Sequence, residues 1–189
     1  MNTKAHLSGG PFALQRVVVT GANGAGKSTF ATTLGQRSGL PVLHNDAFAL
    51  TTRWQRRPRS GVQRAVAQAL SAPRWIIEGG PSLIRPDVLA HAPLVIWLDL
   101  PRGLRIRRII GRSLRYAGRT RPEHPAGNRD WPGVRQVRFV AGAWRDAGAY
   151  NRAISEGLGS YPVTRLTSPQ AISAFLDTVE TAGEGTKLL

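Results

Sequence analysis

The chain has 189 residues, of which 41% are hydrophobic and 20% charged, a composition typical of one soluble globular domain. It contains no cysteine, which excludes disulfides and thiolate metal sites, and no apolar segment approaches the roughly 18 to 20 residues of a membrane span. The net charge of +15 comes almost entirely from arginine, which suits phosphate binding but equally a GC-rich genome, so charge alone assigns no partner.

The first ten residues lack the apolar core of a signal peptide, so we expect a cytoplasmic protein without membrane contact. One domain is expected over residues 16–180, with flexible ends at residues 1–15 and 181–189.

Short apolar runs that end in polar residues or glycine recur along the chain, as buried parallel strands do. They are found at residues 16–20, 41–44, 75–77, 94–98 and 163–166. Helices are expected between them, at residues 27–37, 62–70 and 86–91. This alternation predicts an α/β protein with a three-layer fold: a parallel sheet of about five strands, with helices on both faces.

The second half of the chain contains an arginine-rich segment between two expected helices. The helices span residues 101–116 and 134–154, and the intervening residues 117–132 are rich in Gly, Pro and Arg. This insert predicts a small mobile lid, whose base reaches back to about residue 111. A closing helix at residues 169–179 has Ser168 as its expected N-cap.

A phosphate-binding loop follows the first expected strand. Gly21, Gly26, Lys27 and Ser28 satisfy the spacing G-x-x-x-x-G-K-[ST], and a strand and a helix flank the loop as this motif requires. Glycines let several backbone N–H groups converge on one anion at a helix N-terminus. The predicted nucleotide-binding residues are Gly21, Ala22, Asn23, Gly24, Ala25, Gly26, Lys27, Ser28 and Thr29. Lys27 is expected to reach the outer phosphates of ATP, and Ser28 to coordinate Mg²⁺.

Three carboxylates follow expected strands, where ligands bind in open α/β sheets. Asp46 is predicted to orient an acceptor hydroxyl or a water on Mg²⁺, the alternative being a helix or turn cap. Glu78 and Asp99 are both candidates for the carboxylate on the Mg²⁺ side. For Asp99, capping the helix that begins near Pro101 is an equally good explanation.

Arginines are concentrated around the expected lid. Four of them share one helix face and two more lie in the insert: Arg105, Arg108, Arg112, Arg115, Arg119 and Arg121. Cations without acidic neighbours repel one another, so a bound polyanion such as a nucleoside triphosphate would explain them. A solvated basic surface is the alternative.

The chain resembles adenylate-kinase-like P-loop kinases, and specifically the FlaR-like "DNA topology modulation" group, over about residues 17–152. Besides the phosphate loop, four segments carry the resemblance: L-P-V-L-H-N-D at residues 40–46, W-I-I-E-G at 75–79, W-L-D-L-P-R at 97–102 and L-R-Y-A-G-R-T-R-P at 114–122. It implies that residues 21–29 bind ATP phosphates and that Asp46 faces the acceptor. It also implies that Arg108 and Arg112 lie at the lid base, and that Arg119 and Arg121 are lid arginines.

The resemblance to adenylate kinase itself fails at residues 78–82. Adenylate kinase reads D-G-F-P-R there and uses the arginine to hold the acceptor monophosphate, whereas this chain ends the segment in Ser82. This departure argues against AMP as the acceptor. Arg85 or Arg53 is a possible substitute.

The sequence therefore predicts an ATP-dependent phosphotransferase or ATPase, most simply a small-molecule kinase of the nucleoside or nucleotide type whose acceptor it does not identify. The alternative is an ATP-binding protein that acts on nucleic acid, because four arginines surround Trp54 at residues 53–59. A GTP-dependent switch is disfavoured, since the chain lacks an Asn-Lys-x-Asp motif. ATP and Mg²⁺ are the expected ligands, and the sequence does not indicate an oligomeric state.

Overall fold

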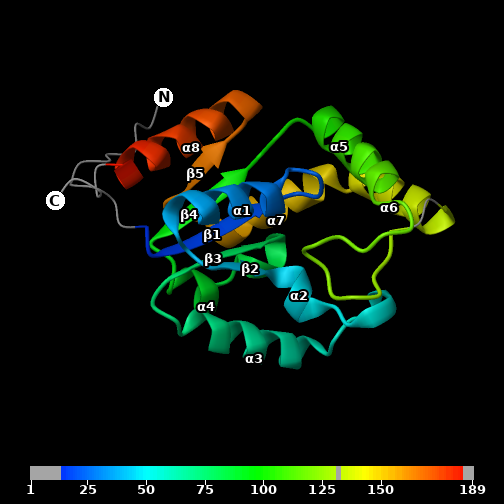
Figure 1. Ribbon diagram of the computed structural model, residues 1–189, viewed down its shortest axis with the longest axis horizontal. Coiled ribbons are helices and arrows are strands. Elements are labelled where there is room, and N and C mark those ends of the chain that lie inside the picture. Colours follow the sequence, from blue (N-terminus) through cyan, green and yellow to red (C-terminus); the bar gives the residue numbers. More distant parts are fainter. Residues whose placement is uncertain (1–13, 131–132, 185–189) are drawn as a thin grey trace.

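The computed structural model describes residues 14–130 and 133–184, and its centre is a five-stranded parallel sheet (Figure 1). The strands are β1 (Arg16–Gly21), β2 (Val42–His44), β3 (Trp75–Gly79), β4 (Leu94–Leu98) and β5 (Thr164–Leu166). They lie in the order β2-β3-β1-β4-β5, with all four neighbouring pairs parallel. The predicted parallel sheet of about five strands is confirmed.

Alternate side chains of each strand enter two separate cores, as the two-residue period of a strand requires. On one face, Val17 and Val19 pack with α1 (Lys27–Ser38) and α8 (Pro169–Glu184). On the other, Val18 packs with α3 (Arg59–Leu70), α4 (Pro86–Leu89) and α7 (Ala147–Leu158). The three-layer arrangement is therefore confirmed.

The carboxyl ends of the strands share one edge of the sheet because all the strands are parallel. The turn from β1 into α1 lies at this edge, as do α2 (Asn45–Ala49) after β2 and the short 3-10 helix η2 (Pro81–Leu83) after β3. The residues predicted to carry the chemistry are thus brought to one end of the domain.

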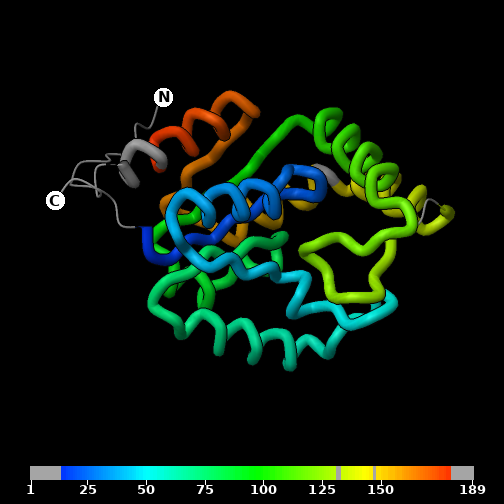
Figure 2. Tube along the Cα trace, in the orientation of Figure 1, coloured from blue at the N-terminus to red at the C-terminus, as the bar shows by residue number. Residues whose placement is uncertain are grey.

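The remaining elements lie beyond this edge. They are α5 (Arg102–Arg115), the connection at residues 116–130, α6 (Val134–Arg145) and the 3-10 helix η1 (Thr52–Trp54). Figure 2 shows the connection after α5 descending to meet the chain between α2 and α3. Residues far apart in the sequence are therefore neighbours here.

Several element boundaries differ from the sequence expectation. The helix predicted at residues 134–154 is two helices, because the helical conformation is interrupted at Asp146, which ends α6 and precedes α7. The helix predicted at residues 62–70 begins earlier, at Arg59. Ser168 does cap α8, since its Oγ accepts a hydrogen bond from the Ala171 backbone N–H at 3.1 Å.

The chain ends are only partly described. Residues 1–13 and 185–189 of the two terminal segments expected to be flexible lie outside the described residues, whereas α8 includes residues 181–184. No described helix combines the length and the apolar character that a membrane crossing would need.

Candidate functional site

The loop between β1 and α1 has a backbone that only glycine accommodates. Gly24 and Gly26 have φ angles of 80° and 90°, in the left-handed region that disfavours other residues. A Cβ atom on Gly24 would also lie 2.4 Å from the carbonyl oxygen of Arg105. The loop therefore keeps its path, with its N–H groups and the start of α1 available to an anion.

Cationic side chains are bonded to the carbonyls of this loop. Lys27 Nζ donates to the carbonyl of Ala22 at 3.3 Å, and Arg108 Nη1 to that of Ala25 at 3.1 Å. Burial lowers the pKa of Lys27, against the opposing influence of Glu78 and Asp46. A partly buried ammonium beside the loop is well suited to a phosphate ligand.

Arg105, an expected member of the basic helix face, supports the loop. Its side chain is buried, and its Nε donates to the carbonyl of Leu100 at 3.0 Å. Its Nη1 lies 3.5 Å from the carbonyl of Asn23, so it joins α5 to the loop. Burial is also the cause of its lowered pKa.

Ser28 and Glu78 form the oxygen pair expected for a magnesium site. Ser28 Oγ donates to Glu78 Oε1 at 3.2 Å, and the same carboxylate oxygen lies 2.9 Å from His44 Nδ1. The hydrogen bond to Glu78 raises the pKa of His44. Mg²⁺ prefers oxygen ligands and often keeps several waters beside one or two protein groups and the phosphates. A hydroxyl and a buried carboxylate fit that requirement, and the described residues contain no cluster of three or more ligands that would hold a metal alone.

Asp99, the other candidate for the metal, is directed elsewhere. Its Oδ1 accepts a bond from Asn151 Nδ2 at 2.7 Å, and its Oδ2 accepts one from Arg165 Nε at 2.9 Å. It caps no helix, since no side-chain cap is found at the start of α5. Its bonds join β4 to α7 and β5, an arrangement that strengthens the sheet edge.

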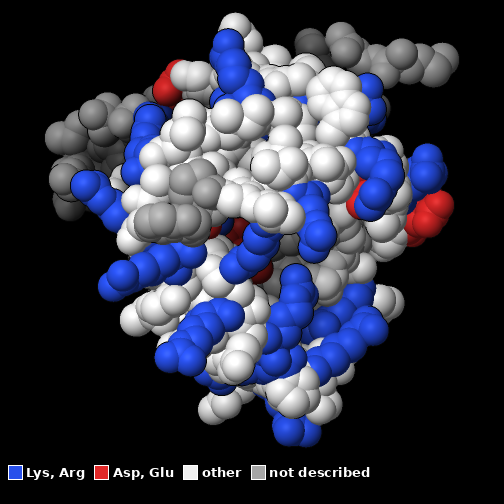
Figure 3. Space-filling model, turned by 90° about the vertical axis from the view of Figure 1, so that its right-hand side faces the viewer, with Lys and Arg blue, Asp and Glu red and all other residues white. Residues whose placement is uncertain are grey.

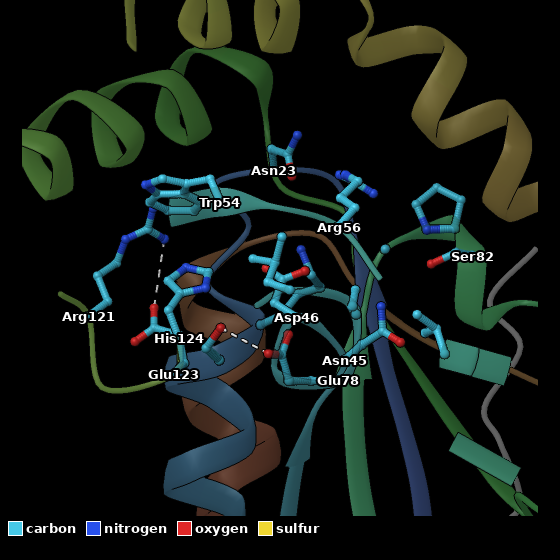
Figure 4. Close-up of a pocket in the computed structure, with 18 of the residues that line it drawn as sticks. Asn23, Asn45, Asp46, Trp54, Arg56, Glu78, Ser82, Arg121, Glu123 and His124 are labelled. Atoms are coloured by element: carbon cyan, nitrogen blue, oxygen red, sulfur yellow. Dashed lines mark hydrogen bonds and ion pairs between the residues drawn. The ribbon is translucent and has the colours of Figure 1, made fainter. Parts of the chain in front are cut away.

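A cavity of about 890 Å³ opens from the phosphate loop toward α2, α3 and α6. This volume is within the range of small-molecule sites. Asn23, Lys27 and Ser28 line one part of it, and Asp46 projects from α2 between Glu78 and the lid residues (Figure 4). The structure thus brings Asp46, Glu78 and the phosphate loop to one chamber.

The predicted lid arginines separate into three environments. Arg112 and Arg121 line the cavity, Arg108 lies against the phosphate loop, and Arg119 is exposed and does not line the cavity. Burial, and then the neighbouring Arg121, lowers the pKa of Arg112. Arg121 is held by Asp130, with Nε 2.5 Å from Oδ2 and Nη2 3.0 Å from Oδ1. A bidentate pair of this kind fixes the orientation of a guanidinium.

The connection at residues 116–130, the predicted lid, packs on the chain that follows α2. Asn128 is fully buried, and its Nδ2 donates to the carbonyls of Thr51 at 2.7 Å and Pro125 at 3.0 Å. Its Oδ1 accepts the backbone N–H of Trp54. Arg53 and Trp54 both adopt left-handed backbone conformations, with φ of 54° and 60°, which are uncommon for residues other than glycine. One amide side chain therefore holds this unusual turn against the lid.

Trp54 packs against His124 of the connection and Arg135 of α6. The centroid of its ring lies 5.1 Å from that of the His124 ring and 4.1 Å from the guanidinium carbon of Arg135. His124 is buried, and neither of its ring nitrogens has a hydrogen-bond partner in the described chain. Burial, together with Arg121, lowers the pKa of His124, which favours the neutral ring.

Sequence reasoning did not identify several cavity residues. Glu123, His124, Arg135 and Tyr150 were given no role, and Arg85 entered only as a possible substitute for the missing arginine. Nothing in their local spacing distinguishes them, because they reach the cavity through tertiary packing. The position of Arg56, Arg57 and Arg59 beside Trp54 was the one available signal, and all three line the cavity.

The chain matches no protein-family model and no curated protein sequence. Solved structures do share its fold. A shikimate kinase from Acinetobacter baumannii, solved in complex with shikimate, aligns with a TM-score of 0.54 and 17% identity, over 93% of this chain and 96% of that one.

Two further kinases align at a similar level. A putative kinase from Chloroflexus aurantiacus gives a TM-score of 0.53 and 20% identity, over 90% of this chain and 99% of that one. A gluconokinase from Sinorhizobium meliloti gives 0.51 and 13%, over 92% and 93%. At these identities the likeness establishes the fold, so the chain has the P-loop kinase fold. The resemblance to the FlaR-like group stays a prediction.

Proposed function

We propose that this protein is an ATP-dependent kinase that phosphorylates a small hydroxyl-bearing acceptor. The observation that carries the proposal is the single cavity in which the phosphate loop, the Ser28–Glu78 pair and Asp46 meet. A switch or a motor also needs the loop, but it does not need a carboxylate beside an adjoining chamber of small-molecule size. The shared fold of the three kinases above supports the same class of reaction.

The proposed roles follow from position. The loop N–H groups and Lys27 bind the β- and γ-phosphates of ATP, while Ser28 and Glu78 would hold Mg²⁺, which would supply neutralisation of the phosphate charge. Asp46 accepts the proton of the acceptor hydroxyl, and the hydroxyl oxygen bonds to the γ-phosphorus. The bond from that phosphorus to the bridging oxygen breaks, which releases ADP, and the proton passes to solvent. Arg112 and Arg121 face the transferring group from the lid side.

Action on nucleic acid is the weaker proposal. Arg56, Arg57 and Arg59, the basis for expecting a nucleic-acid surface, line the cavity, whereas Arg53 does not. Arginines around a chamber of this volume suit a small anion better than an extended phosphate backbone, which needs a continuous basic track.

The proposal is tested by phosphate transfer from labelled ATP to a panel of alcohols, sugars, sugar acids, nucleosides and their monophosphates. We expect at least one labelled product. Asp46→Asn should lower its rate of formation by about 10²- to 10⁴-fold while ATP binding is retained, because only the proton acceptor is lost. Tight Mg·ATP binding with no transfer to any member of the panel would contradict the assignment.

A further inference from the structure

Cations line the cavity in addition to Lys27, Arg112 and Arg121. Five arginines contribute to it: Arg56, Arg57, Arg59, Arg85 and Arg135. Within residues 14–130 and 133–184, their only ion pair with a carboxylate joins Arg85 Nε to Asp87 Oδ1 at 2.9 Å. Figure 3 shows the same excess on the surface, where basic side chains gather around a hollow with carboxylates in its depth.

The charges of the whole cavity do not balance. Eight Lys and Arg side chains line it, against four carboxylates. Glu123 and Asp130 both lie within 4 Å of Arg121, and Glu78 is bonded to Ser28. Of the four carboxylates that line the cavity, Asp46 is therefore the one with neither an ion pair among the described residues nor a proposed place at the metal site. It cannot neutralise Arg56, Arg57, Arg59 and Arg135, which have no carboxylate partner among the described residues.

ATP does not supply the missing charge. The proposed function assigns its phosphates to the loop, Lys27 and Arg112, while Arg121 is paired with Asp130. An uncharged acceptor would leave the remaining arginines to repel one another in a partly enclosed space, where charges interact more strongly than in water.

Arg85 gives this excess of charge a specific location. It precedes α4, lines the cavity and is 22% exposed, its Nε lies 2.9 Å from Asp87 Oδ1, and its Nη2 has no hydrogen-bond partner in the described chain. A guanidinium carries five N–H donors and is costly to leave unsatisfied. An anion in the cavity would offset the charge of this side chain, which lines it. Ser82, whose side chain lines the cavity near Arg85 in sequence, offers a hydroxyl donor in addition.

We propose that the acceptor carries its own anionic group, a phosphate monoester or a carboxylate, which Arg85 and Arg56 bind while the hydroxyl to be phosphorylated faces Asp46. In Figure 4, Arg56 and Ser82 lie on the opposite side of Asp46 from Arg121 and His124. An acceptor bound there would have its anionic group at one end and its reacting hydroxyl at the other. The inference rests on the proposed kinase function and names its substrate class.

Paired acceptors test this proposal. Each pair contains a neutral alcohol and the same skeleton with a phosphate or a carboxylate: a sugar with its monophosphate and its acid, and a nucleoside with its monophosphate. We expect kcat/KM to be at least about tenfold higher for an anionic member, since charge-assisted bonds discriminate at this level. The phosphate and carboxylate arms identify which anion is bound.

Variants connect the preference to the proposed residues. Arg56→Ala and Arg85→Met should each raise the KM for the anionic acceptor by about tenfold and leave the KM for ATP unchanged. Arg64→Ala is the matched control, because Arg64 is exposed on α3 and does not line the cavity. Arg56 is exposed, so its variant is informative even if Arg85→Met folds poorly.

The outcomes separate this inference from the kinase proposal. Equal kcat/KM for the neutral and anionic acceptors would overturn the inference, and so would a preference for the anionic acceptor that persists in both variants. Neither result would contradict the proposed kinase activity. Calorimetric titration of the same compounds into protein saturated with a non-hydrolysable ATP analogue and Mg²⁺ measures the anion site without turnover. Binding of the anionic members that weakens in Arg56→Ala but not in Arg64→Ala would support the anion site even if no transfer occurs. Failure of both members to bind would reject it.

Discussion

The two ends of the cavity are built by different means. At the phosphate end, one strand, one loop and one helix of consecutive residues set the geometry, largely through backbone conformation at Gly24 and Gly26. At the lid end, the contacts of Asn128 with Thr51 and Trp54 span 77 and 74 residues of sequence. Backbone-built geometry tolerates change in side chains around it, whereas the lid end depends on individual buried side chains.

The largest expected effect of a substitution is at the phosphate end. Lys27→Met should lower phosphate transfer by about a thousandfold, because it removes a positive charge aimed at the phosphates. The unfolding temperature should change little, since burial already disfavours the charged ammonium. Transfer kinetics with thermal unfolding of the same samples measure both. A large loss of stability with modest loss of transfer would mean that Lys27 serves the fold instead.

Glu78, near the end of β3, and Asp99, just after β4, provide a second contrast. Glu78→Gln should lower the transfer rate by about a hundredfold and raise the Mg²⁺ concentration needed for half-maximal rate. Asp99→Asn should leave both nearly unchanged and lower the free energy of unfolding by about 1 kcal/mol, because its bonds to Asn151 and Arg165 are structural. Magnesium titrations and urea unfolding distinguish the two. A reversed pattern would assign the metal to Asp99.

At the lid end, Asn128→Ala should raise the acceptor KM by about tenfold with a smaller effect on ATP, since three backbone groups lose their partner together. Hydrogen exchange should accelerate in residues 51–57 and 116–130 and remain slow in β1 and α1. Unchanged exchange at residues 116–130 would show that this contact does not hold the lid. Arg119→Ala, at an exposed lid position, is the control and should alter none of these quantities.

The smallest expected effect comes from His44 and His124, whose pKa values are shifted in opposite directions. The pKa of His44 is raised from 6.5, so its contribution to stability is complete below that pH and is lost as pH rises through the folded-state pKa. The pKa of His124 is lowered from 6.5, so its contribution is present above that pH and is lost as pH falls. Arg121, which lies near His124, opposes protonation there.

Replacing each histidine in turn separates these contributions. Relative to wild type, His124→Phe should gain stability as pH falls from 7 to 5, while His44→Gln should lose it, by about 2 °C or less in unfolding temperature. Parallel thermal unfolding over this pH range measures the difference. The same sign for both variants would contradict the assigned environments.

The phosphate end was predictable because its signal is local. Glycine spacing, a preceding β-branched run and a following helix together specified the loop, and the apolar runs specified all five strands. Asp46 and Glu78 both line the cavity, since parallel strands align their carboxyl ends, and their chemical roles stay predictions. Asp99 satisfies the same rule yet is directed to β5, because its rotamer depends on Asn151 and Arg165, which come later in the chain.

The lid end was only partly predictable. The composition of residues 117–132 indicated a lid, but residues 131–132 lie outside the described residues, and the partners of the lid were not foreseen. Asn128 and His124 owe their roles to the turn at Trp54, and no spacing within either segment encodes a contact between them. The break at Asp146 was missed because the apolar pattern continues across it.

The left-handed pair Arg53 and Trp54 has a kinetic consequence. Each such residue costs on the order of 1 kcal/mol relative to an ordinary conformation, and here the bond from the Trp54 N–H to Asn128 compensates for it. We propose that this turn favours opening of the predicted lid, because breaking the Asn128 contact would let the two residues relax. We expect Gly at position 53 to remove this restoring force and to prolong the residence time of ADP.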